Sequence, residues 1–102
     1  MLPNEIELPT AENFCRGTYN NYRGQCCFVG WQRKLLPELN YEETKRFRAI
    51  AKNEAQKMRL RNGIMGEDYR GITRVNDDTH NTKEQLANWF AQTVRVFGYD
   101  IS

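Results

Sequence analysis

Residues 40–63, NYEETKRFRAIAKNEAQKMRLRNG, contain the clearest structural signal in the chain. Asn40, followed three residues later by Glu43, forms a capping box that begins a helix. Asn62-Gly63 is a helix-stop signal. At about 100° per residue, one side of this helix is mostly apolar. That side carries Thr44, Phe47, Ile50, Ala51, Ala55 and Met58. The pattern predicts an amphipathic helix from Asn40 to about Arg61.

Glu54 interrupts the apolar side of this helix. A buried carboxylate must either pair with a cation or shift its pKa. We therefore expect Glu54 to pair with a basic side chain from another element, such as Arg74, or to mark a polar pocket.

A second helix is predicted near the end of the chain. Thr82 and Gln85 form another capping box, and Gly98 ends the helix. The face expected to be buried carries Leu86, Trp89, Phe90, Thr93, Val94 and Phe97. Two amphipathic helices can enclose a core when a third element covers them.

That third element is predicted over residues 25–36, before Pro37. Apolar residues at positions i, i+3 and i+7 favour a helix here, namely Phe28, Trp31 and Leu35. The apolar run at 26–29 would also suit a short buried strand, so both alternatives stay open.

The remaining segments lack a helical period. Residues 1–9 contain two prolines and predict an extended lead-in. Residues 17–24 are typical of a loop. Residues 72–75 suit a short strand or an extended segment, and a fully polar loop, residues 76–81, precedes the last helix.

Composition is that of one globular domain. The chain has 102 residues, of which 39% are apolar and 27% charged. We therefore predict a single mainly α domain over residues 1–102, with three to four helices and short extended segments near 26–29 and 72–75 as an alternative.

Charge is distributed unevenly along the chain, although the net charge is only +2. Residues 1–15 carry −3, residues 16–61 carry +7, and residues 62–102 carry −2. Such asymmetry indicates an anionic partner for the middle segment, or pairing of that segment with the ends.

The expected cellular location follows from two features that the sequence does not show, a secretory signal and a membrane-spanning segment. The acidic start of the chain is unlike a secretory signal, and the longest apolar run, residues 26–29, is far shorter than a bilayer span. We expect a cytoplasmic protein with reduced thiols at Cys15, Cys26 and Cys27.

Several residues have types that support catalysis or metal binding. Cys26 or Cys27 at a helix N-terminus, with His80 as a base, would suit a cysteine enzyme. Cys15, Cys26, Cys27 and His80 are the ligand types of a Cys3His zinc site, but their spacing is not that of a zinc site, and buried packing is the favoured role for Cys26 and Cys27. Asp77 and Asp78, with Asn76, could hold a divalent cation, but turn formation is the favoured interpretation. We expect no metal and no cofactor.

Basic residues form a stripe on the polar side of the 40–61 helix, at Lys45, Arg48, Lys52 and Arg59. Further cations precede the helix at Arg16, Arg23, Arg33 and Lys34. Such cations can meet phosphates, and Tyr19 and Tyr22 beside Arg23 could stack a base. The alternative is a solvated helix face.

Two stretches resemble a family of small helical proteins of bacteria and phages. In that family a Cys-x-Gly and a Cys-x-x-Gly segment precede an Asn-Asp turn and a last amphipathic helix. Here these are Cys15–Gly17, Cys27–Gly30 and Asn76-Asp77, ahead of Thr82. The resemblance implies a helical fold, a structural place for Asn76-Asp77 and a phage or mobile-element origin. It implies no activity.

We therefore expect a non-enzymatic binding protein, namely a phage-type inhibitor that blocks a host or defence component through its basic face. Two alternatives remain open: a binder that sequesters a nucleotide or signalling molecule, and a small cysteine-dependent enzyme or nuclease. The expected binding residues are Tyr22, Arg23, Lys45, Arg48, Lys52, Arg59, Asn76 and Asp77. The partner is a protein or an anionic ligand, such as a nucleotide or nucleic acid, and the oligomeric state is open.

Overall fold

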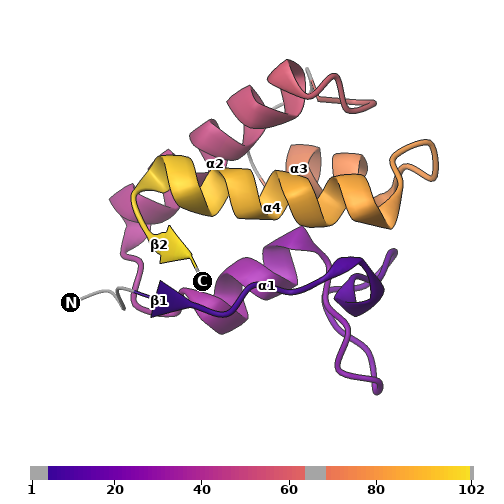
Figure 1. The fold of residues 1–102 in the computed structure, drawn as a ribbon, viewed down its shortest axis with the longest axis horizontal. Helices are drawn as coiled ribbons and strands as arrows, with labels where there is room; N and C mark the ends of the chain where they lie inside the picture. Colours follow the sequence, from indigo (N-terminus) through magenta and orange to yellow (C-terminus); the bar gives the residue numbers. More distant parts are fainter. Residues whose placement is uncertain (1–4, 64–68, 102) are drawn as a thin grey trace.

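The computed structural model describes residues 5–63 and 69–101, and Figure 1 shows its mainly helical fold. The described residues form four α-helices, a short 3-10 helix and two short strands. In chain order these are β1 (Glu5–Ile6), η1 (Ala11–Asn13), α1 (Phe28–Leu35), α2 (Tyr41–Lys57), α3 (Tyr69–Asp77), α4 (Lys83–Phe97) and β2 (Asp100–Ile101). None of these helices is long and apolar enough to cross a bilayer.

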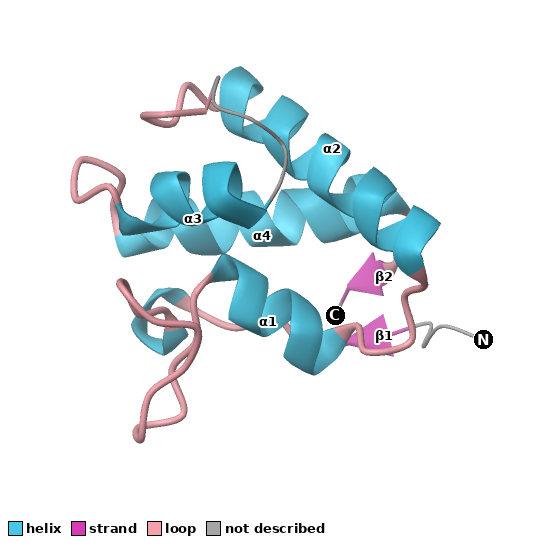
Figure 2. Cartoon of the chain, turned by 180° about the vertical axis from the view of Figure 1, so that it is seen from behind, coloured by secondary structure: helices cyan, strands magenta, loops and turns pink. Residues whose placement is uncertain are grey.

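Helix α4 runs through the middle of the molecule, with α2 on one side and α1 on the other (Figures 1 and 2). Helix α3 packs against both α1 and α2. A buried hydrogen bond ties the two long helices together, because Trp89 Nε1 donates to the carbonyl of Ala51 at 2.7 Å. The predicted pairing of two amphipathic helices under a third element is therefore confirmed.

Aromatic rings fill the centre of the core. Phe28 of α1 lies 4.0 Å from Trp89 and 5.0 Å from Phe90, measured between ring centroids. Phe47 of α2 contacts the same group at 6.1 Å from Phe28. All four side chains are fully buried, and each contributes roughly 1.5–3 kcal/mol through burial. Phe28 thus joins α1 to both long helices.

The predicted capping boxes are present at the starts of α2 and α4. Glu43 N–H donates to Asn40 Oδ1 at 2.8 Å, and Thr82 N–H donates to Gln85 Oε1 at 2.7 Å. Gly98 ends α4 with a positive φ of 122°, a conformation that favours glycine. These local signals were sufficient to place three helix ends.

The end of α2 differs from the prediction, because the helix stops at Lys57 and not near Arg61. Arg59 takes a left-handed conformation, with φ of 58°, and Leu60 N–H bonds back to Ala55 O at 2.9 Å. This is a Schellman-type stop. It buries Leu60, which is 5% exposed, and that burial offsets the strain at a non-glycine residue.

The predicted extended segment at 72–75 is wrong, because these residues belong to α3. Ile72 and Val75 are both buried, one helical turn apart. Two apolar residues between Gly71 and a polar run are too few to show a helical period. Contacts with α1 and α2 therefore stabilise a helix that local sequence does not indicate.

The alternatives at residues 26–29 are resolved in favour of a helix that begins at Phe28. Cys26, just ahead of it, is extended and forms isolated bridges with Phe14 and Asn20. At the two ends of the described chain, β1 pairs in parallel with β2, so that Glu5 lies opposite Asp100. The expected lead-in is thus a strand at 5–6, while residues 1–4 lie outside the described part.

Glu54 is buried, as the phase of α2 predicts, with an exposed fraction of 4%. Lys57 Nζ lies 3.1 Å from Glu54 Oε2 and forms an ion pair with it. This partner is one turn further along the same helix, in place of the expected Arg74 on another element. The flexible lysine reaches over the helix surface while its own side chain stays 68% exposed.

Replacing Gly30 with alanine tests how tightly α1 meets the preceding loop. A Cβ at this position would lie 2.1 Å from the backbone oxygen of Tyr19. We expect Gly30→Ala to destabilise the fold by about 1–3 kcal/mol, although alanine is the better helix former. Urea denaturation measures this change. The control Asn53→Ala, at an exposed position of α2, should shift stability by less than about 0.5 kcal/mol. Equal midpoints for Gly30→Ala and the wild type would contradict the close contact.

Candidate functional site

Three short segments that are distant in the sequence meet at the N-terminal end of α1. The side-chain amide of Asn76 joins them, because its Nδ2 donates to Cys15 O at 2.9 Å and its Oδ1 accepts from Phe28 N–H at 3.0 Å. The neighbouring Asp77 Oδ1 accepts from Gly17 N–H at 2.9 Å. Asn76 is fully buried. Its amide therefore holds the end of α3 against α1 and the segment before it.

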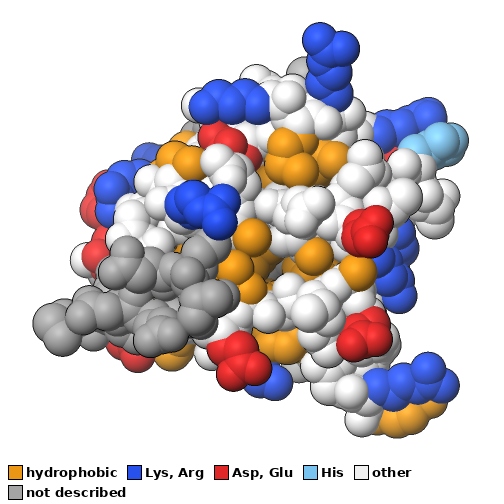
Figure 3. Space-filling view, viewed as in Figure 1, with side chains coloured by type: hydrophobic (Ala, Val, Ile, Leu, Met, Phe, Trp, Pro, Cys, Tyr) orange, Lys and Arg blue, Asp and Glu red, His pale blue; other side chains and the backbone are white. Residues whose placement is uncertain are grey.

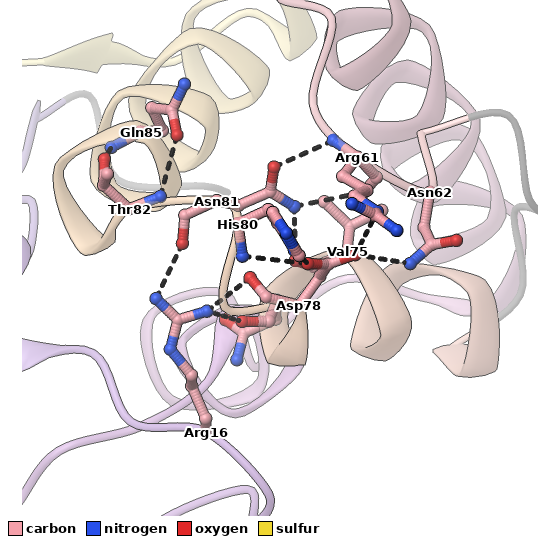
Figure 4. Close-up of polar contacts among 10 residues, drawn as sticks. Arg16, Arg61, Asn62, Val75, Asp78, His80, Asn81, Thr82 and Gln85 are labelled. Carbon is pink, nitrogen blue, oxygen red and sulfur yellow. Dashed lines mark hydrogen bonds and ion pairs between the residues drawn. The ribbon is translucent and has the colours of Figure 1, made fainter.

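Arg16 closes the same junction from the outside (Figure 4). One guanidinium nitrogen donates to Asp78 O at 2.6 Å and to Asn76 O at 3.1 Å, and the other donates to Asn81 O at 2.6 Å. These carbonyls lie at and just beyond the C-terminus of α3, where a cation is favoured by the helix dipole. Arg16 is thus occupied by the fold and is not available to a partner.

Asn81 makes a similar internal link. Its Oδ1 accepts from Arg61 N–H at 2.8 Å, and its Nδ2 donates to Val75 O at 2.9 Å and Arg61 O at 3.0 Å. The turn after α2 is therefore fastened to the loop before α4. Residues 78–81 serve as a structural latch, in agreement with the turn interpretation of the polar segment.

Asp78 is the charged centre of this latch. Its carboxylate accepts from Asn62 Nδ2 at 2.8 Å and from His80 N–H at 2.9 Å, and lies 3.4 Å from Arg61 Nε. The backbone N–H of His80, aided by the His80 ring and the Arg61 guanidinium, lowers the pKa of Asp78. His80 Nδ1 is itself 3.1 Å from Asp78 Oδ1, so the histidine is oriented by the latch.

The three cysteines are buried, and for Cys27, which does lie at the N-terminus of α1, burial outweighs the backbone N–H groups that favour a thiolate. Burial raises the pKa of Cys15, Cys26 and Cys27. Cys27 Sγ caps α1 by accepting from Gly30 N–H at 3.5 Å. Within the described part of the chain, no hydrogen bond joins His80 to a cysteine, and no cluster of three or more His, Cys, Asp or Glu side chains could hold a metal. These surroundings give a cysteine nucleophile no support.

The predicted binding residues do not share one surface. On α2, Lys45 is exposed while Arg48 and Lys52 are half-buried, and Arg59 lies in the turn beyond the helix. Asn76 and Asp77 belong to the junction at the start of α1. Of the predicted binding residues, only Tyr22 and Arg23 are both exposed and adjacent. They belong to the 17–24 loop, which projects from the molecule on the side of α4 that faces away from α2 (Figure 1).

The projecting loop and α1 present three cations, each over an aromatic ring. The Arg33 guanidinium lies 4.8 Å from the centre of the Tyr19 ring. Lys34 Nζ lies 5.2 Å from Trp31, and the Arg23 guanidinium 5.7 Å from Tyr22. We call this surface the aromatic–cationic face, formed by Tyr19, Tyr22, Arg23, Trp31, Arg33 and Lys34. Figure 3 shows basic atoms lying over hydrophobic ones at the loop tip, lower right.

A hollow of about 740 Å³ opens in this face, between the loop and α1. Tyr19 and Asn21 line it from the loop, and Arg33 and Lys34 line it from the helix. This volume lies within the roughly 300–1,000 Å³ typical of small-molecule sites. Gly30 also lines the hollow, and its lack of a Cβ allows the Tyr19 carbonyl to lie close to α1.

Hydrogen bonds fix the shape of the loop that forms one wall. Cys27 N–H donates to Tyr19 O at 3.1 Å. Asn21 Oδ1 accepts from the N–H groups of Arg23 and Gln25, at 3.0 and 3.1 Å. Gly24 takes a positive φ of 78° at the return of the loop. The wall is therefore ordered before any partner arrives, which lowers the entropy cost of binding.

A smaller hollow of about 350 Å³ shares Thr18 and Tyr19 with the larger one. Cys27, Thr73 and Asp77 line it. Asp77 therefore lines the smaller hollow and does not line the basic one. The sequence offered Arg33 and Lys34 only as additions to the α2 stripe. Arg33 and Lys34 differ from the basic residues of α2 because they follow Trp31 in the last turn of α1, and this position in the sequence could have distinguished them.

Acidification should weaken the latch through Asp78. The pKa of Asp78 in the folded state lies below its ordinary value of 3.8, so its contribution to stability is present above pH 3.8 and is lost as the pH falls through the lowered pKa. We expect the difference in free energy of unfolding between wild type and Asp78→Asn to be largest at neutral pH and to shrink below pH 3.8. Urea denaturation across pH measures it. A difference independent of pH would contradict this role. The control Glu12→Gln, at an exposed position, should change stability by less than about 0.5 kcal/mol.

Thiol labelling tests the state of the cysteines. Because exposed fractions are 6%, 4% and 1% for Cys15, Cys26 and Cys27, and burial raises each pKa, we expect negligible reaction with a disulfide reagent at neutral pH. All three thiols should react after denaturation. One rapidly reacting thiol in the folded protein would instead indicate an activated cysteine.

No family model, curated protein or solved structure matches this chain.

Proposed function

We propose that this chain is a non-enzymatic binding protein that engages an anionic partner through the aromatic–cationic face. The supporting observation is that Arg23, Arg33 and Lys34 lie over aromatic rings, while none of the ion pairs among the described residues involves them. A cation held by a ring keeps its charge available to an incoming anion. A cation already paired with a carboxylate would have to give up that partner first.

The α2 stripe is less suited to this role. Acidic residues share the helix, with Glu42 and Glu43 in its first turn. Glu54 binds Lys57 within it, and Arg46 covers the Phe97 ring at 4.3 Å. Basic residues of α2 therefore partly cover the core and partly balance nearby carboxylates. For this reason we propose α1 and the 17–24 loop, and not α2, as the binding surface.

The shape of the face supports an inhibitor that acts by occlusion. The loop at 17–24 projects beyond the helices (Figures 1 and 2), and the Tyr22 side chain at its tip is 92% exposed. Tyrosine and arginine are the residue types that most often anchor interfaces. In this proposal, a phage-type protein covers an anionic surface or ligand that a host or defence component needs.

Charge reversal on the face should weaken retention by a polyanion. We expect the double variant Arg33→Glu, Lys34→Glu to elute from heparin at lower salt than wild type, because fewer cations release counterions from the polymer. The matched control is Lys45→Glu, Arg74→Glu, which changes net charge equally at exposed positions on α2 and α3. Like Arg33 and Lys34, Arg74 lies in the last turn of its helix.

The two double variants separate local recognition from net charge. Equal elution of both would mean that overall charge governs retention, and the proposal would be wrong. Circular dichroism and urea denaturation of each variant guard against loss of fold. The neutral pair Arg33→Gln, Lys34→Gln should elute between wild type and the charge-reversed protein.

A further inference from the structure

We propose that the hollow beside Tyr19 binds a nucleotide, either free or as one unit of a single strand. This inference rests on the proposed function, because it names the anion that the aromatic–cationic face recognises. Its phosphate would lie at Arg33 and Lys34, and its base would lie against an aromatic ring of the loop. The hollow of about 740 Å³ has room for one such unit.

The helix wall provides the phosphate contacts. Arg33 and Lys34 are adjacent, both exposed, and both line the hollow. A guanidinium can donate two parallel hydrogen bonds to a phosphate, and an ammonium adds a second charge. None of the described residues that line the hollow is acidic. The charge inside it is therefore of one sign, as a phosphate requires.

The loop wall provides a surface for the base. The Tyr19 ring is 38% exposed and lines the hollow. Asn20, next to it, is exposed, and its side-chain amide makes no hydrogen bond with any described residue. Stacking on a tyrosine tolerates any base, whereas an unoccupied amide can bond to the edge of one. Ring and amide thus lie beside the same hollow as the two cations.

The loop tip suggests how a longer strand would continue. Tyr22 and Arg23 form a second ring-and-cation pair, with the guanidinium 5.7 Å from the ring centre. Gly24, directly after this pair, lines the hollow. A nucleotide next to the one in the hollow would therefore meet another ring and another positive charge. A flat acidic protein surface would contact the rim but leave the hollow empty.

Binding measurements with defined phosphates test the inference on the intact chain. The probes are pyrophosphate, adenosine and uridine triphosphates, and twelve-nucleotide single strands of DNA and RNA. Isothermal titration at low and moderate salt gives each affinity. The variant Tyr19→Leu removes the ring but keeps the backbone contacts to α1. The variant Arg33→Gln, Lys34→Gln removes both charges, and Lys45→Gln on α2 serves as the matched control.

The expected pattern separates base from phosphate. Tyr19→Leu should weaken binding of nucleotides by about tenfold, which is within the range for loss of one stacking ring, and should weaken pyrophosphate binding much less, because pyrophosphate has no base to stack. The charge variant should weaken both, and Lys45→Gln neither. Binding of the free triphosphates would identify a free nucleotide as the source. Binding of the twelve-nucleotide strands alone would identify a single strand.

Two outcomes would contradict the inference that the ligand is a nucleotide but would leave the proposed anion-binding function intact. One is equal affinity of the wild type for pyrophosphate and for nucleotides, which would mean that the base of the nucleotide makes no contact with the protein. The other is no binding of any phosphate probe by a chain that heparin or polyglutamate still retains through Arg33 and Lys34. Loss of retention on every polyanion would contradict the proposed function itself, together with this inference.

Discussion

The buried amide of Asn76 is the interaction on which the arrangement of this molecule depends. It satisfies a carbonyl before α1 and the first N–H group of α1 at the same time, and it lies at the end of α3. Leaving either backbone group unpaired in the core would cost about 1–3 kcal/mol. Because an asparagine amide offers both a donor and an acceptor, one side chain fixes three segments that are 13 to 61 residues apart.

Once α1 is fixed, its own backbone shapes the candidate site. Gly30 has no Cβ, so the Tyr19 carbonyl approaches the helix closely, and Cys27 bonds to the same carbonyl. The loop then turns outward and places the Tyr19 ring under Arg33. The aromatic–cationic face is therefore a consequence of tight packing between a loop and a short helix, and its geometry does not require a ligand to form.

The polar residues of the chain divide into two groups that sequence alone did not separate. Arg16 and Asn81 bond to backbone carbonyls of the fold, and the Asp78 carboxylate bonds to Asn62 and His80 and pairs with Arg61. Arg33 and Lys34 face rings and solvent. Both groups contain ordinary surface residue types. Only the position of the partner carbonyls and rings decides whether a cation supports the fold or is available for binding.

Local signals in the sequence determined the long helices, since capping boxes at Asn40 and Thr82 and the stop at Gly98 depend on neighbouring residues only. The burial of Glu54 followed from helix phase in the same way. Tertiary structure decided the rest. Helix α3 forms because α1 and α2 bury Ile72 and Val75, and α2 stops early because Leu60 turns into the core. The candidate site brings the 17–24 loop against the helix that follows it, and contacts between a loop and a helix leave no periodic trace in either segment.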